Sequence, residues 1–158
     1  MIQYNAYSEA VPDDQRGPDG AESAVLSKEW EENATKYEIE NVKKLNSREA
    51  DFSPAYGSNN YNSLIFTSTR EGATGKATDG WTDQNFSDLF SARLDRKEEW
   101  STPVLLDKKE DGINTESNEG TPVLNAKFNS IYFTRCPNED KKSCGCQIYK
   151  SKRIGRSW

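Results

Sequence analysis

Hydrophobic residues along this chain occur in short runs, and turn-forming residues separate one run from the next. From Tyr37 onwards the runs have the length and the alternation of β-strands, with clusters of Gly, Asn, Asp, Ser and Pro between them. The pattern predicts strands over residues 37–45, 63–69, 88–94, 104–106, 130–134 and 147–150. Residues 37–158 are therefore predicted to be all-β.

Residues 1–36 have a different pattern. Residues 12–14 and 17–20 carry the Pro, Gly and Asp residues that predict turns, and residues 21–32 have the composition of a helix. The apolar stripe of that helix is short, so the helix needs a surface on which to dock. We expect a turn-rich and partly helical linker segment over 1–36, followed by the β region over 37–158.

The β region repeats itself along the chain. Three pairs of segments match in the same order, and each copy then leads to a tryptophan, Trp100 in the first and Trp158 in the second. The matching segments are 45–54 with 113–122, 62–67 with 129–134, and 88–93 with 147–152. Three collinear matches indicate an internal repeat.

Each copy predicts a four-stranded antiparallel meander that ends in a strand led by tryptophan. A sheet of this size cannot bury both faces alone, and stacking copies around an axis is the β-propeller solution. We therefore predict a partial β-propeller, with two four-stranded antiparallel blades plus a leading strand over 37–45. A small sandwich or an open sheet is the alternative fold.

The repeated segments resemble the WD40-like, or PD40, β-propeller repeat. The resemblance lies in residues 52–54, 64–70 and 88–90, and in their second copies at 121–122, 131–135 and 147–149. Residues 37–54 are also similar to the start of the propeller in OmpA-like, peptidoglycan-associated envelope proteins, including PorE-type components of the type IX secretion and gliding apparatus. The resemblance covers about residues 30–158.

This resemblance implies a non-enzymatic scaffold that binds other cell-envelope proteins, in the periplasm and associated with the outer membrane. Because such propellers have more than two blades, we expect the chain to be a piece of a longer protein. The open strand edges of a two-blade piece favour self-association. Two other functions stay open, a carbohydrate or peptide binding module that uses aromatic loop residues, and an enzyme that uses paired carboxylates in a cleft.

The composition of the chain excludes several classes of catalytic and binding site. The chain has no histidine, which excludes Ser-His-Asp and Cys-His nucleophile pairs and histidine-ligated metal centres. A net charge of -5 disfavours nucleic acid as a partner, and the short basic run at residues 150–156 is interpreted as a solvated strand edge. No apolar run approaches the roughly 20 residues that cross a bilayer. We expect no catalytic residue, no cofactor and no transmembrane segment.

Three cysteines flank one predicted loop of the second copy. Cys136 follows one strand and Cys146 precedes the next, so a disulfide between them closes a short loop between antiparallel neighbours. A bond from Cys136 to Cys144 is the second possibility, and free thiols are the third. A zinc site with three sulfur ligands needs a fourth ligand, such as Glu139 or Asp140.

The long loop over residues 71–87 is the predicted partner-contact loop. Its aromatic residues Trp81 and Phe86 suit an interface if they are exposed, because aromatic anchors carry much of the energy of interfaces. The alternative is that both fold back over the neighbouring blade. Asp51 and Glu119, at equivalent positions of the repeat, are expected to accept hydrogen bonds from turn amides rather than to act on a substrate.

Overall fold

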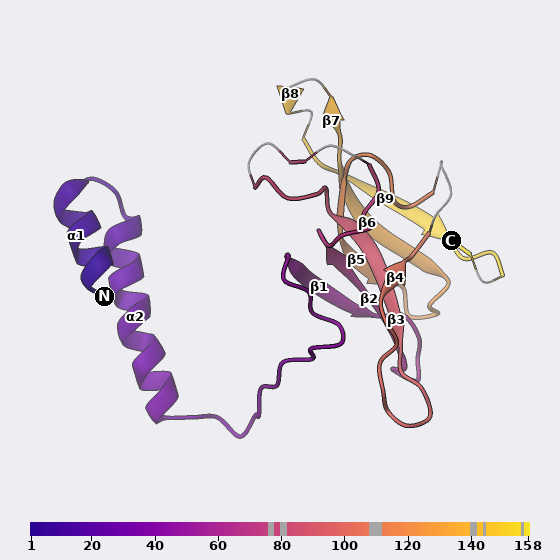
Figure 1. Cartoon of the computed structure of the whole chain (residues 1–158), viewed down its shortest axis with the longest axis horizontal. Coiled ribbons are helices and arrows are strands. Elements are labelled where there is room, and N and C mark those ends of the chain that lie inside the picture. Colours follow the sequence, from indigo (N-terminus) through magenta and orange to yellow (C-terminus); the bar gives the residue numbers. More distant parts are fainter. Residues whose placement is uncertain (76–77, 80–81, 108–111, 140–141, 144, 156) are drawn as a thin grey trace. The chain divides into compact units, whose positions relative to one another are not determined.

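The chain forms two compact units, Met1–Glu40 and Asn41–Trp158 (Figure 1). The structure is a computed structural model that describes residues 1–75, 78–79, 82–107, 112–139, 142–143, 145–155 and 157–158. The first unit is helical and the second contains all of the strands. The boundary falls after Glu40, whereas the sequence pattern placed it after residue 36.

The first unit is a hairpin of two helices, α1 (Ile2–Ala10) and α2 (Arg16–Glu32). A Cβ atom added to Gly20 would lie 2.3 Å from the ring of Tyr4, so the glycine allows the two helices to approach closely. The turn predicted around Pro18 is wrong, because Pro18 lies in the first turn of α2, where a missing N–H leaves no bond unmade. Helix α1 was not predicted from the sequence, and it contains no buried residue that would give a periodic apolar pattern.

The second unit contains two antiparallel sheets and a small hairpin. The first sheet has the order β1 (Asp51–Tyr56), β2 (Ser63–Ser68), β3 (Asp88–Arg93) and β4 (Val104–Leu105). The second sheet has the order β5 (Asn118–Leu124), β6 (Ser130–Cys136) and β9 (Gln147–Lys152). Strands β7 (Asn138–Glu139) and β8 (Lys142–Ser143) form the hairpin. The chain is thus mostly β, as predicted.

The two sheets share one strand register, including a bulge in the first strand of each. Ser53 has a φ of 50° in β1, and Thr121 has a φ of 49° at the equivalent position of β5. The pairs on either side of the bulge are Phe52–Thr67 and Ala55–Ile65 in the first sheet, and Gly120–Thr134 and Val123–Tyr132 in the second. The internal repeat seen in the sequence is therefore a repeat of backbone structure.

Two predicted strands are absent from the described residues. Residues 37–45, predicted as a leading strand, form an irregular segment and a turn without a ladder partner. The second sheet has three strands in the part of the chain that the structure describes, where four were predicted. Trp158, expected to lead a fourth strand, is instead buried in the core at the end of the chain. Two blades of four strands are therefore not formed.

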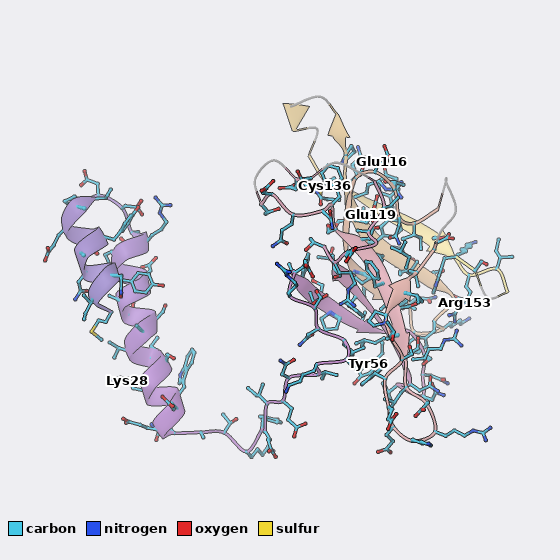
Figure 2. All side chains as sticks on the ribbon, viewed as in Figure 1. Lys28, Tyr56, Glu116, Glu119, Cys136 and Arg153 are labelled. Carbon is cyan, nitrogen blue, oxygen red and sulfur yellow. A yellow bond between two sulfur atoms is a disulfide. The ribbon has the colours of Figure 1, made fainter. Side chains whose placement is uncertain are left out.

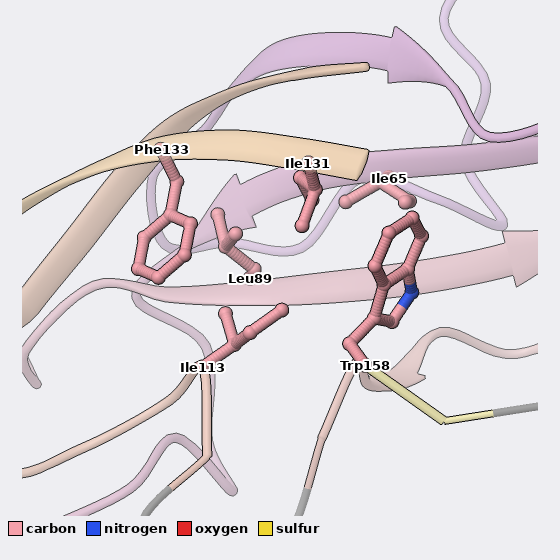
Figure 3. Packing of buried hydrophobic residues seen from close by; sticks show 6 residues of the cluster. All are labelled: Ile65, Leu89, Ile113, Ile131, Phe133 and Trp158. Carbon is pink, nitrogen blue, oxygen red and sulfur yellow. The ribbon is translucent and has the colours of Figure 1, made fainter. Parts of the chain in front are cut away.

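The core lies between the two sheets (Figure 3). Sheet one contributes Ile65 and Leu89, which are 1% and 0% exposed. The second repeat contributes Ile113, Ile131, Phe133 and Trp158. One face of the first sheet is therefore covered by one face of the second, which is the stacking of sheets that the thin predicted core requires.

Candidate functional site

An arginine connects a buried carboxylate to two aromatic rings in the first sheet. Asp51 accepts hydrogen bonds from the amide and the hydroxyl of Ser47, and it forms an ion pair with Arg70. The guanidinium carbon of Arg70 lies 5.1 Å from the ring centroid of Phe66 and 5.2 Å from that of Phe90. The arginine therefore ties the turn before β1 to the face of β2 and β3.

The second sheet repeats this arrangement. Glu119 accepts a hydrogen bond of 3.0 Å from the amide of Thr115 and one of 2.7 Å from Nε of Arg135. The guanidinium carbon of Arg135 lies 5.6 Å from the ring centroid of Phe133 and 4.6 Å from that of Tyr149. The prediction that both repeated carboxylates accept hydrogen bonds from turn amides is confirmed. Their arginine partners were missed, because Arg70 follows β2 whereas Arg135 lies within β6.

The two carboxylates differ in their electrostatic environment. Burial acts to raise the pKa of Asp51, but hydrogen bonds from Ser68, Ser47 and Arg70 hold this pKa below its usual value. Burial raises the pKa of Glu119 to about 7, against the opposing effects of Thr115 and Arg135. The neighbouring carboxyl of Asp88 contributes to that rise.

Asp88 and Glu119 bring two acidic groups together at the junction of the sheets. Both residues are 0% exposed, and burial raises the pKa of Asp88 as well. Oδ2 of Asp88 accepts a hydrogen bond from the amide of Thr74, and Oδ1 has no hydrogen-bond partner among the described residues. Neither carboxyl meets solvent, so this pair is not placed as the two carboxylates of a glycosidase cleft must be.

We expect the stability of the second unit to fall as the pH rises from about 4.5 to about 7. The folded unit keeps a proton on Glu119 up to a pKa of about 7, whereas an unfolded chain loses that proton near pH 4.5. Because the native state binds more protons in this range, raising the pH costs on the order of 3 kcal/mol at most. Urea unfolding at about pH 5 and about pH 8 measures the difference.

Glu119→Gln should reduce this pH dependence, because the amide does not titrate. A smaller loss of stability with rising pH should remain, because burial also raises the pKa of Asp88. Glu116→Gln is the control, since Glu116 is exposed in the turn before β5. An unchanged pH dependence in Glu119→Gln would contradict the prediction.

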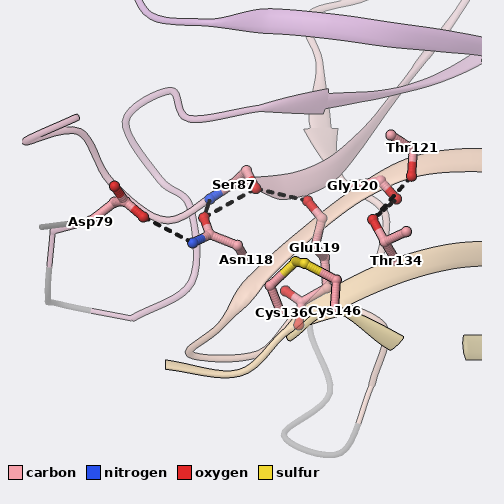
Figure 4. Close-up of a disulfide and its surroundings, with 9 residues drawn as sticks. All are labelled: Asp79, Ser87, Asn118, Glu119, Gly120, Thr121, Thr134, Cys136 and Cys146. Carbon is pink, nitrogen blue, oxygen red and sulfur yellow. Dashed lines mark hydrogen bonds between the residues drawn. A yellow bond between two sulfur atoms is a disulfide. The ribbon is translucent and has the colours of Figure 1, made fainter. Parts of the chain in front are cut away.

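Main-chain and side-chain hydrogen bonds fasten the two sheets together. Oδ1 of Asn114 accepts from the amide of Leu89 at 2.8 Å, and Nδ2 of Asn114 donates to the carbonyl of Leu89 at 3.0 Å. The amide of Glu119 donates to the carbonyl of Ser87 at 2.7 Å, and the Ser87 hydroxyl donates to the carbonyl of Glu119 (Figure 4). Asn46, the equivalent of Asn114 in the first copy, is exposed. The asparagine at this repeat position therefore joins the two copies in one case, Asn114, and is a surface residue in the other, Asn46.

Among the described residues, no sheet packs on the face of the first sheet that corresponds to this docking face, and the segment that contains Leu45 covers part of it. This face carries an apolar hollow of about 180 Å³. Phe52 is 43% exposed there, whereas its counterpart Gly120 is buried. A Cβ atom on Gly120 would lie 3.4 Å from Cγ2 of Thr67, which is van der Waals contact, so this position of β5 faces the first sheet closely. The hollow is lined by Val42, Leu45, Asn46, Asp51, Phe52, Pro54, Leu64 and Phe66.

A disulfide joins Cys136 to Cys146, the first of the predicted pairings (Figure 4). The bond spans ten residues of sequence and encloses the β7–β8 hairpin, and a loop of this length gains about 2 to 3 kcal/mol from cross-linking. Cys144 lies outside the described residues, as does Asp140. Among the described residues, no cluster of three or more metal-ligating side chains occurs, so nothing there supports the zinc alternative.

The predicted partner-contact loop over residues 71–87 contains Phe86, whose exposure the structure describes. Phe86 is 3% exposed, so of the two alternatives for this ring the structure shows the buried one. The apolar ring is buried within the unit, where it contributes to folding. Trp81 lies outside the described residues.

Comparisons with protein-family models, with curated proteins and with solved structures find no match to this chain. Among the described helices, none is both long and apolar enough to span a membrane.

Proposed function

We propose that this chain is a non-enzymatic protein–protein interaction scaffold, in which the two sheets act as blades of a β-propeller and their open faces bind further sheets. The observation that carries the proposal is the uncovered hollow on the first sheet. The residues that line this hollow are the repeat equivalents of those with which the second sheet packs on the first. For example, Phe66 in the hollow corresponds to Phe133 in the core. The resemblance to OmpA-like, peptidoglycan-associated proteins supports a cell-envelope setting, in the periplasm and at the outer membrane.

The second sheet has the complementary open face. Ile148 is 80% exposed and Val123 is 57% exposed. Their equivalents in the first copy are Leu89, which is 0% exposed and faces the second sheet, and Ala55. The second unit therefore has two open faces, the Phe52 face of the first sheet and the Ile148 face of the second. In repeat positions, these correspond to the two faces that pack against each other inside the chain. Such an arrangement favours head-to-tail association with a second copy.

The test is self-association, measured by analytical ultracentrifugation over a range of concentrations. We expect the wild-type chain to associate, and we expect Phe52→Asp and Ile148→Asp each to be monomeric when alone, because each variant has lost one of the two faces that pair. An equimolar mixture of the two variants should form a heterodimer, because each variant keeps the face that the other has lost. The driving force is the burial of apolar surface at the open faces.

Ile39→Asp is the matched control. Ile39 is 95% exposed and lies before the sheets, so the same change of charge there should leave association unchanged. A wild-type chain that stays monomeric at every concentration would overturn the proposal. Association that survives in the Phe52→Asp, Ile148→Asp double variant would also overturn it.

A further inference from the structure

The antiparallel topology brings several polar segments to one end of the second unit. The β1–β2 connection over residues 57–62 and the β5–β6 connection over 125–129 both lie there, together with the last residues of β3 and β9. Figure 2 shows Arg153 and Tyr56 toward this end, and Glu119 and Cys136 toward the other. The end with the strand connections, here called the hairpin end, is thus separate from the carboxylates and from the disulfide.

Two hollows open at the hairpin end, and they share one arginine. The larger, of about 590 Å³, is lined by polar residues that include Asn125, Asn129 and Lys152. The second, of about 420 Å³, lies between the two sheets and includes Asn60 in its lining. Arg153 lines both hollows. Volumes of this size are in the range of small-molecule sites, about 300 to 1,000 Å³.

The charge of this surface is opposite to that of the chain. The lining of the two hollows includes Arg93, Lys127, Lys152 and Arg153, and no described lining residue is Asp or Glu. The whole chain has a net charge of -5. Cations gathered without carboxylates in an acidic protein produce a local field that selects anions. Lys152 of the basic run is exposed on the edge strand β9, as predicted, and Lys152 and Arg153 also line a hollow.

Arg153 is held in place as a binding residue requires. Its guanidinium carbon lies 4.9 Å from the ring centroid of Trp158, which is itself 9% exposed. Nε of Arg153 is buried and has no hydrogen-bond partner among the described residues. A buried donor without a partner is unfavourable, and a bound anion would satisfy it. Stacking on the indole fixes the guanidinium plane before the ligand arrives, which lowers the entropy lost on binding.

The other lining groups indicate the class of ligand. The Asn side chains can both donate and accept hydrogen bonds, which suits the hydroxyl groups of a sugar. Lysine and arginine suit a carboxylate, a sulfate or a phosphate. We propose that the hairpin end binds an acidic saccharide, with the acid group at Arg153 and Lys152 and the ring hydroxyls at Asn125 and Asn129.

The experiment titrates the ¹⁵N-labelled chain with a short oligogalacturonate and with a sulfated heparin fragment. A malto-oligosaccharide of equal length and inorganic phosphate, both at matched ionic strength, serve as the neutral sugar and the free anion. We expect at least one acidic saccharide to bind and to shift the amide resonances of residues 57–62 and 125–130. The saccharide that binds more tightly identifies the acid group. Neither the neutral sugar nor phosphate should bind as tightly.

Variants locate the site. Arg153→Gln and Lys127→Gln should each weaken binding, with at least about a tenfold loss for Arg153→Gln, because hydrogen bonds to charged groups are the strong ones. Lys127 is exposed in a turn, so its substitution does not threaten folding. Lys150→Gln is the matched control, since it removes the same charge from β9, where Nζ of Lys150 lies 5.3 Å from the ring of Tyr132 and outside both hollows.

Three results would overturn the proposal. The first is that neither acidic saccharide binds. The second is that phosphate binds as tightly as both of them, which would indicate a simple anion site. The third is that Lys150→Gln weakens binding as much as Arg153→Gln does, since the effect would then come from net charge rather than from a built site.

Discussion

Leu89→Ala should destabilise the second unit by about 3 kcal/mol, the cost expected for a large cavity in a packed core. Leu89 is 0% exposed and lies in the cluster between the two sheets. Ile148 occupies the same position of the repeat, opposite Thr134 in the ladder as Leu89 is opposite Thr67. Because Ile148 is 80% exposed, Ile148→Ala should change stability by less than about 0.5 kcal/mol.

Denaturant titrations of the two variants and the wild type give these free energies of unfolding. The comparison holds register and repeat position constant for two aliphatic side chains of similar size, one on the inner strand β3 and covered by a second sheet, the other exposed on the edge strand β9. Equal losses in both variants would show that the two sheets do not pack through the face that contains Leu89.

Asn114→Ala should cost about 2 to 4 kcal/mol, because it leaves buried main-chain groups without partners. Asn114 bonds both the amide and the carbonyl of Leu89, and its Nδ2 also approaches the carbonyl of Asp107 at 3.4 Å. Asn114 itself is 2% exposed, so water cannot replace these bonds at low cost.

Asn46→Ala is the matched control, at the equivalent position of the first copy. Asn46 is exposed, and its Nδ2 donates to the side chain of Asn41 at 2.8 Å. Its substitution should therefore cost less than about 0.5 kcal/mol, because water can replace a lost surface hydrogen bond. Thermal unfolding followed by circular dichroism compares the two variants. A loss for Asn46→Ala as large as that for Asn114→Ala would contradict the assignment of Asn114 as the fastener between the sheets.

The two pairs of variants also bear on the proposed stacking. Each of the exposed partners, Ile148 and Asn46, lies on one of the two open faces. If a second copy docks as the chain's own sheets do, Ile148→Ala should weaken association while leaving the free energy of unfolding of the monomer nearly unchanged. At this one repeat position, Leu89→Ala then tests folding and Ile148→Ala tests association.

The sequence alone predicted the parts of the structure that depend on local pattern. Short strand-like runs separated by turn residues located the strands now seen at β2, β3, β6 and β9, and self-comparison located the repeat. The positions of Asp51 and Glu119 before the repeated Pro residues were sufficient to predict that both accept hydrogen bonds from turn amides. Each of these features arises from residues close together in the chain.

Local pattern does not predict the structure of segments whose conformation depends on a tertiary neighbour. The run at 37–45 has strand composition but finds no neighbouring strand with which to form a ladder. The segment around Pro18 has turn composition, yet it begins a helix because α1 offers α2 a surface on which to pack. For Phe86 the sequence left exposure and burial open, and the fold decides for burial.

The sequence by itself determined that this chain contains two copies of one antiparallel strand pattern, with a carboxylate at the equivalent position of each, Asp51 and Glu119. Tertiary structure decided which copy covers the other, and therefore why Leu89 is buried while Ile148 is exposed. It also brought Arg70 and Arg135 to equivalent places from different positions in the sequence. The physical reason is that alternation fixes which residues share a face, whereas burial of that face depends on the neighbour that packs against it.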